Sequence, residues 1–185
     1  MAGDAVEEPD PQVVLEAQRG AAAAFETLVR AYQAPVWRLV FQLVHDPQLA
    51  EDVTQEAFLR AYRFLPRYRG DSRFSTWLLS VARNCAMDEL RRFERRQRLV
   101  DRLRARPESQ HADVALPVEV RDALASLPLE LREPIVLIDM LGTSYAEVAQ
   151  ILEIPVGTIK SRVHRGRGLL GEALAPSAGA GEESP

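Results

Sequence analysis

Four basic side chains lie close together between Lys160 and Arg167, with no acidic residue among them. Arginine can form two parallel hydrogen bonds to a guanine edge, and lysine pairs with phosphate. Serine and threonine hydroxyls can bond either group. This chemistry predicts contacts to duplex DNA by Thr158, Lys160, Ser161, Arg162 and Arg165. The alternative is an ordinary helical hairpin with a solvated basic face.

Two short helices must position these side chains. Ser144 stands where an N-cap belongs and Glu147 follows three residues later, so a capping box begins a helix over residues 145–152. In a second helix, Ile159 and Val163 share a buried face. A short helix, a tight turn and a helix with a basic outer face predict a helix-turn-helix.

The turn between these helices lacks the glycine that often stands there. Glu153 occupies that position, so we expect the turn to form without a residue of positive φ. Pro155 follows, and it suits the first turn of the second helix, where no N–H donor is needed.

A second cluster combines basic and aromatic side chains in a loop over residues 67–75. Cations follow the phosphates of a single strand, and ring faces stack on unpaired bases at about 1–3 kcal/mol each. The loop therefore predicts contacts to single-stranded nucleic acid by Arg67, Tyr68, Arg69, Arg73 and Phe74. The alternative is a solvated surface turn with Phe74 packed on the core.

A helix predicted over residues 48–64 carries a polar, mostly acidic face that includes Asp52, Gln55, Glu56 and Arg60. Its buried side is predicted to contain Leu49, Val53, Ala57 and Leu59. No histidine lies near the acidic residues at a helical ligand spacing, so a metal site is not expected.

Composition limits the possible classes of function. The chain has 185 residues and a net charge of -4, but nine arginines fall between Arg83 and Arg106, which predicts a local basic surface. The single Cys85 suits a reducing cytoplasm. There is no signal peptide and no apolar run of about 18 residues, so membrane insertion is not expected. Without a nucleophile–base set or a P-loop, we expect no enzyme activity and no cofactor.

The order of the segments predicts an all-α protein with two small helical domains joined by a charged linker. Residues 1–11 and 175–185 are predicted to be disordered tails. The domains are placed at 12–96 and 118–174, with the linker at 97–117. Further helices are expected over Pro11–Arg19, over Ala22–Val44 with a kink or break at Pro35, and from the end of the loop to Arg92. In the second domain they are expected over Val118–Leu127 and over Leu129–Leu141, which Gly142 ends.

Three motifs in this order resemble the extracytoplasmic-function (ECF) sigma factors, group 4 of the sigma-70 family. They are DVTQEAFLRAY at 52–62, FSTWLLSVARN at 74–84, and SYAEVAQIL at 144–152 with PVGTIKSRVHRGR at 155–167. The resemblance covers residues 12–174. It implies an alternative sigma factor that binds core RNA polymerase and promoter DNA and initiates transcription at specific promoters.

The resemblance also implies roles for residues. Asp52, Gln55, Glu56 and Arg60 would bind the polymerase β′ clamp, and the second domain would lie near the β flap. The loop 67–75 would hold an extruded base of the −10 element, while Asn84, Asp88 and Arg91 would read or position that strand. Residues 156–170 would dock the −35 element. Such a compact protein is often held inactive by an anti-sigma factor.

Two other classes of function fit parts of the pattern. One is a stand-alone helix-turn-helix regulator with a helical sensing domain, which would bind duplex DNA tightly without polymerase. The other is an adaptor that does not bind DNA, for which the basic face would be dispensable.

Overall fold

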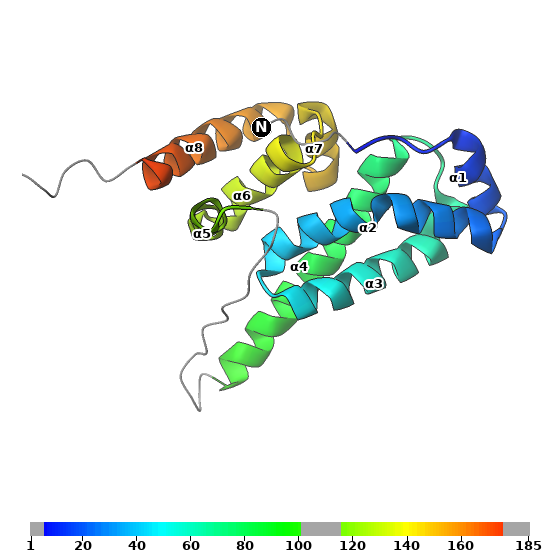
Figure 1. Cartoon of the computed structure of the whole chain (residues 1–185), viewed down its shortest axis with the longest axis horizontal. Helices are drawn as coiled ribbons and strands as arrows, with labels where there is room; N and C mark the ends of the chain where they lie inside the picture. The colour runs from blue at the N-terminus through cyan, green and yellow to red at the C-terminus, as the bar shows by residue number, and fades with distance from the viewer. Residues whose placement is uncertain (1–5, 101–115, 176–185) are drawn as a thin grey trace, which may run out of the picture.

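The computed structural model describes residues 6–100 and 116–175, and within these ranges it contains helices and turns but no strand. This confirms the all-α class. No helix in these two ranges is long and apolar enough to cross a membrane. The elements are α1 (Pro11–Gln18), α2 (Ala22–Val44), α3 (Pro47–Phe64), the 3₁₀ turn η1 (Leu65–Arg67), α4 (Phe74–Val100), α5 (Val118–Ser126), α6 (Leu129–Ile135), the π-helical turn η2 (Val136–Met140), α7 (Tyr145–Leu152) and α8 (Val156–Leu174) (Figure 1).

The first domain packs α1–α4 around an apolar core (Figure 1). Apolar side chains at helical spacing along α2 fill much of it: Leu28, Tyr32, Val36, Leu39, Val40 and Leu43. Of the kink or break predicted at Pro35, the structure excludes the break, because α2 is one helix from Ala22 to Val44. Burial on both sides of the proline, at Tyr32 and Val36, offsets the hydrogen bond that Pro35 cannot donate.

The buried side of α3 differs from the predicted one at Leu59. This side chain is 54% exposed, whereas Phe58 is 9% exposed and Thr54 is 8% exposed. The buried stripe therefore includes the residue before Leu59, and Leu59 joins the polar face. The start of α3 is fixed by Asp46, whose Oδ1 accepts a hydrogen bond from the backbone N–H of Leu49 at 2.9 Å.

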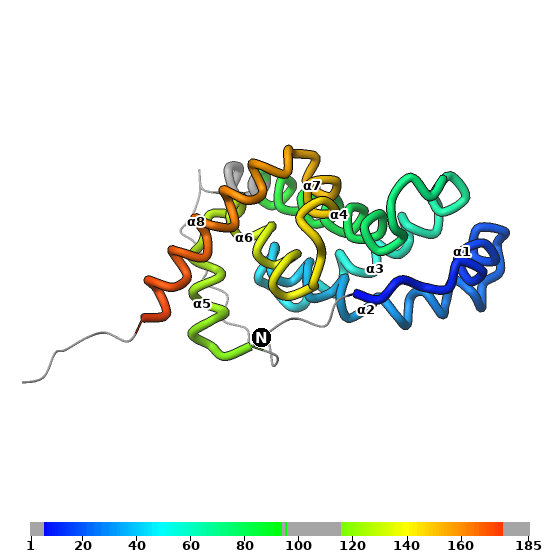
Figure 2. The backbone as a smooth tube through the Cα atoms, turned by 90° about the horizontal axis from the view of Figure 1, so that it is seen from above, coloured from blue at the N-terminus to red at the C-terminus, as the bar shows by residue number. Residues whose placement is uncertain are grey.

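The second domain contains α5–α8, with α8 lying across α5 and α6 (Figure 2). The apolar segment predicted as one helix over residues 129–141 divides after Ile135, where the backbone changes from α-helix to the π-helical turn η2. Gly142 follows with φ 65°, a conformation that glycine adopts without strain. Gly166 of α8 is buried, which lets α8 approach α6 closely.

The two domains share one continuous apolar core. Val136, Leu137 and Leu141 of the second domain, together with Val148 and Ile151 of α7, belong to the same buried cluster as the first domain's helices. Accordingly, α7 packs on α4 and η2 packs on α2. The sequence did not predict this arrangement, because it depends on surfaces that either domain could have presented to solvent.

Polar contacts reinforce this interface. The Arg83 guanidinium pairs with Glu133, with 2.7 Å between Nε and Oε1, and the Glu133 side chain is only 6% exposed. The buried Arg132 donates to the carbonyl of Gln42 at 3.2 Å. Burial lowers the pKa of the nearby His45 to about 4, with a further contribution from the Arg132 charge, so this imidazole is neutral near pH 7.

Residues 6–10 form an extended segment that lies against both domains, and we call it the N-terminal strap. The backbone N–H of Val6 donates to the Leu141 carbonyl at 3.3 Å, and the Tyr32 hydroxyl donates to the Glu7 carbonyl at 2.6 Å. We predicted disorder over residues 1–11, and these contacts correct that for 6–10. Residues 1–5, the linker at 101–115 and the tail at 176–185 lie outside the described ranges.

The close approach at Gly166 predicts a specific loss of stability. A Cβ at this position would overlap Ile135 Cδ1 and touch Leu131, both of which are buried. We expect Gly166→Ala to have a free energy of unfolding about 1–3 kcal/mol lower than that of Gly168→Ala, measured by urea denaturation, because both gain helix propensity but only the first overpacks the core. Gly168→Ala on the same helix is the matched control, because a Cβ there meets nothing within 4 Å. A Gly166→Ala protein as stable as this control would contradict the packing.

Candidate nucleic-acid interface

The helix-turn-helix begins with the predicted capping box. The Ser144 hydroxyl accepts the Glu147 N–H at 3.3 Å, and Glu147 Oε2 accepts the Ser144 N–H at 2.9 Å. Burial alone would raise the pKa of the Glu147 carboxyl, but the hydrogen bonds from Ser144 and Arg73 outweigh it and hold that pKa below its usual range. Glu147 is therefore ionised near neutral pH and stabilises the start of α7.

The turn after α7 forms in a way that we predicted wrongly. Glu153 itself takes the left-handed conformation, with φ 56° and ψ 39°, and its N–H donates to the Ala149 carbonyl. The N–H of Ile154 also donates to this carbonyl, at 3.1 Å. A residue with a Cβ thus adopts a backbone that costs it about 1–2 kcal/mol, and the two hydrogen bonds that end α7 hold it there.

Helix α8 presents the five residues predicted to contact duplex DNA. Its inner face is anchored as expected by Ile159 and Val163, which are 0% and 1% exposed. Three of the predicted contact residues are exposed: Lys160, Ser161 and Arg165. The other two, Thr158 and Arg162, are partly buried. Their assignment to DNA stays a prediction.

Two acidic residues lie beside the cations of this helix. Arg162 is 4.0 Å from Glu130, while Arg167 pairs with Asp139 through Nε at 3.1 Å. The pairing with Asp139 directs Arg167 toward η2. The sequence could not predict this, because Asp139 lies 28 residues before Arg167.

The loop between η1 and α4 exposes most of the predicted single-strand contacts. Arg67, Arg69 and Arg73 are exposed, and Tyr68 is partly buried. The Tyr68 hydroxyl donates to the Ser72 carbonyl at 2.6 Å, so its ring is fixed in place. The basic side chains are thus spread along a turn that internal hydrogen bonds hold.

Phe74 lies in the core, in agreement with the predicted alternative of a surface turn with Phe74 packed on the core. Its side chain is 3% exposed, and its ring packs edge-on against Tyr32 with 5.4 Å between centroids. Tyr68 and Trp77 contact the same ring, at 6.0 and 5.6 Å. No face of the ring is open to an unpaired base, which corrects its predicted contact role. Phe74 instead anchors the end of the loop in the core.

Ion pairs join two sets of residues to which the resemblance gives different roles, polymerase binding and contact with the −10 element. Arg60 of α3 contacts Glu56 through Nε at 2.9 Å and Asp88 of α4 through Nη1 at 2.9 Å. Asp88 also pairs with Arg91, at 3.4 Å. The hydrogen bond from Arg60 lowers the pKa of Asp88 and keeps it ionised. The predicted polymerase-binding residues are thereby connected to the predicted −10 residues.

The remaining predicted residues lie at the surface. Asp52 and Gln55 are exposed on α3 beside the unexpected Leu59, and Asn84 is exposed on α4. Within residues 6–100 and 116–175, no group of three metal-ligating side chains is close enough to hold a metal ion.

Comparisons with known proteins match both domains. The sigma-70 region 2 family matches residues 28–98, and the sigma-70 region 4 family matches residues 118–170. The RNA polymerase sigma-H factor of Pseudomonas aeruginosa is 37% identical, covering 92% of this chain and 96% of its own. The ECF RNA polymerase sigma-E factor of Escherichia coli is also 37% identical, covering 90% and 95%.

Two solved structures share the arrangement. The sigma factor RpoE of Bartonella quintana, crystallised with the anti-sigma factor NepR, superposes with a TM-score of 0.73 at 27% identity, covering 83% of this chain and 98% of its own. CnrH in complex with the cytosolic domain of CnrY gives a TM-score of 0.69, also at 27% identity, covering 88% and 95%.

The strained turn gives a testable outcome. Glycine adopts φ 56° without a Cβ clash, so Glu153→Gly should be more stable than Glu153→Ala by about 1 kcal/mol. Both variants remove the carboxylate, so the comparison isolates the backbone. Urea unfolding of the full chain measures the difference. An alanine variant at least as stable as the glycine variant would show that the turn carries no strain.

Proposed function

The chain belongs to the sigma-70 family, in its extracytoplasmic-function group, and on that basis we propose that it binds core RNA polymerase and directs transcription initiation at its own set of promoters. The observation that carries this proposal is the presence of both sigma regions in order, with an intact helix-turn-helix in the second. The stand-alone regulator is not favoured, because region 2 matches where a sensing domain would be needed.

In this proposal α8 enters the major groove at the −35 element. Arg162 and Arg165 would read guanine edges or pair with phosphates, while Lys160, Thr158 and Ser161 would fix the helix on the backbone. The exposure of Arg165 and Lys160 supports direct contact. The ion pair of Arg167 with Asp139 favours a supporting role for that residue.

The loop at 67–73 and the outer face of α4 would hold the melted −10 strand. Arg67, Arg69 and Arg73 would track phosphates, and Tyr68 would flank an extruded base. Asn84, Asp88 and Arg91 would position the strand along α4. The buried Phe74 would hold the loop in place against the core.

Helix α3 would dock on the polymerase β′ clamp. Asp52, Gln55 and Glu56 offer carboxylate and amide groups to a basic helix, and Leu59 adds an exposed apolar contact between them and the end of the helix. Arg60 would hold this surface against α4. Region 4 would lie near the β flap.

The chain would act in the cytoplasm with the polymerase, would catalyse no reaction itself and would need no cofactor. One structural relative is a complex with an anti-sigma factor, and the other is a complex with a cytosolic protein domain, which supports regulation of this chain by an anti-sigma partner.

Run-off transcription with purified core polymerase on a promoter library tests the function. Adding the chain should produce start sites that core polymerase alone does not use. Arg162→Ala and Arg165→Ala should each relax −35 selection by about 1–3 kcal/mol per lost bidentate contact. Arg30→Ala is the control, since Arg30 is an exposed residue of α2 paired only with Glu26 four residues away in the contacts described. No new start sites would overturn the proposed function; unchanged −35 selection would overturn the base-reading face.

A further inference from the structure

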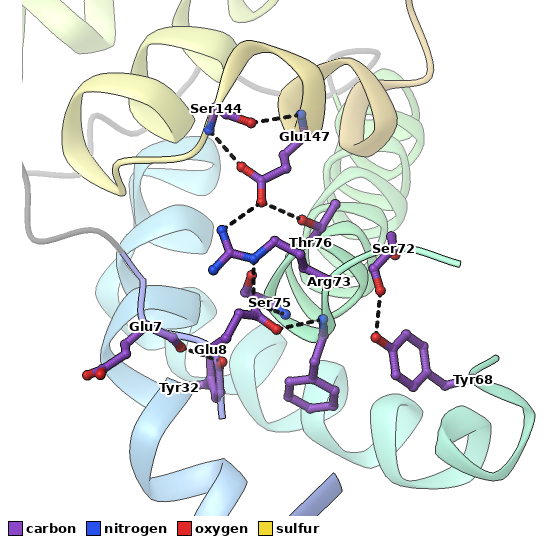
Figure 3. A network of polar contacts seen from close by, with 11 residues as sticks. Glu7, Glu8, Tyr32, Tyr68, Ser72, Arg73, Ser75, Thr76, Ser144 and Glu147 are labelled. Atoms are coloured by element: carbon purple, nitrogen blue, oxygen red, sulfur yellow. Dashed lines mark hydrogen bonds and ion pairs between the residues drawn. The ribbon is translucent and has the colours of Figure 1, made fainter. Parts of the chain in front are cut away.

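The N-terminal strap delivers a carboxylate to the start of α4 (Figure 3). Glu8 Oε2 accepts the N–H of Phe74 at 3.0 Å, and Oε1 accepts the N–H of Ser75 at 3.1 Å. The same carboxylate pairs with Arg73, at 3.4 Å from Oε1 to Nε. One side chain from 66 residues upstream therefore satisfies two donors and one cation.

Helix α4 depends on this carboxylate because it has no cap of its own. The residue before Phe74 is Arg73, whose side chain carries donors and no acceptor. The first N–H groups of a helix have no partner within the helix, and they attract anions. Glu8 fills this place and adds a charge-assisted hydrogen bond to each N–H.

Arg73 is held by acids from two sides. Besides Glu8, it contacts Glu147 of α7, with 3.1 Å between Nη1 and Oε1. The strap continues to Val6, whose N–H donates to Leu141 of the second domain. The carboxylates of the strap and of α7 thus meet on a single guanidinium between the domains.

The chemistry of this place matches that of a phosphate. Two N–H groups of a helix start and an adjacent guanidinium form an anion site, and a backbone phosphate would satisfy the same donors as the Glu8 carboxylate. The strap carries its acid onto the loop of basic and aromatic residues proposed for the −10 strand. Strap and strand therefore require the same groups.

We propose that the N-terminal strap is an acidic latch that occupies the anion site at Arg73 and competes with single-stranded DNA for it. The proposal rests on the proposed function, because it places the −10 strand on this loop. While the latch is closed, the free chain keeps its strand site occupied and its domains together. Displacing Glu8 frees the N–H groups of Phe74 and Ser75 and removes one of the two carboxylates that pair with Arg73.

The test uses the free full-length chain and a fluorescent dT20 oligonucleotide, with binding followed by anisotropy at low salt. Glu8→Gln removes the negative charge from the anion site and leaves Glu147 as the one carboxylate described on Arg73. We therefore expect it to bind dT20 about threefold or more tightly than the unmodified chain. Glu7→Gln is the matched control. It makes the same charge change on the strap, but the exposed Glu7 side chain points away from Arg73 (Figure 3). Among the described residues, Glu7 is bonded through its backbone carbonyl alone.

A second pair of proteins, with and without Glu8→Gln in an Arg73→Ala chain, tests whether the gain depends on Arg73. In Arg73→Ala protein, Glu8→Gln should give no gain, because the shared cation is gone. Equal or weaker binding by Glu8→Gln than by Glu7→Gln overturns the latch while leaving the sigma function intact. A gain that persists without Arg73 also overturns it, since the effect would then be general electrostatics. If no variant binds dT20, the loop is not a strand site, and the latch fails together with that part of the proposed function.

Discussion

The arrangement of the whole chain depends on burial along α4. Leu78, Leu79 and Ala82 are at most 1% exposed, and the helix packs on α2 and α3 within its own domain and on α7 of the other. Its polar side carries the residues proposed to contact the melted strand. The helix-turn-helix and the proposed strand site are therefore supported by the same element, and close-packed interiors transmit strain. A change in how α7 packs on α4 would therefore alter both proposed DNA surfaces.

The packed arrangement also sets a geometric limit. Promoter elements named for positions −35 and −10 are centred about 25 base pairs apart, which is about 85 Å on straight duplex at about 3.4 Å per base pair. A compact body made of the described residues 6–100 and 116–175 has a radius of gyration of about 15 Å. Two surfaces on so small a body cannot reach both elements. Within the proposed function, the packed form is a resting form, and its partly exposed pairs, such as Arg73 with Glu147, suit an interface that must open.

The sequence predicted the features that depend on residues close together in the chain. The capping box at Ser144 and the buried pair Ile159 and Val163 follow from spacing alone, and the structure confirms them. Prediction from the sequence failed where contacts with residues far away in the chain determine which side chains are buried. Leu59 is exposed because the α3 stripe is set by the packing of α2 and α4, and Phe74 is buried because Tyr32 and Trp77 close over it.

The strap and the ion pairs of α3 are further features that depend on residues far away in the chain, in these cases through charge. Acidic composition predicts disorder for a short tail, yet a carboxylate gains more from two helix N–H groups and a guanidinium than from water. Arg60 likewise belongs by sequence to a polar helix face, but its contacts with Glu56 and Asp88 bridge two helices. A partner that binds the acidic face of α3 would compete with Arg60 for Glu56. Arg60 would then bind Asp88 alone, and the charge around Arg91 would change before DNA arrives. Within the proposed function, binding at the polymerase surface would thus alter the charge at the strand surface.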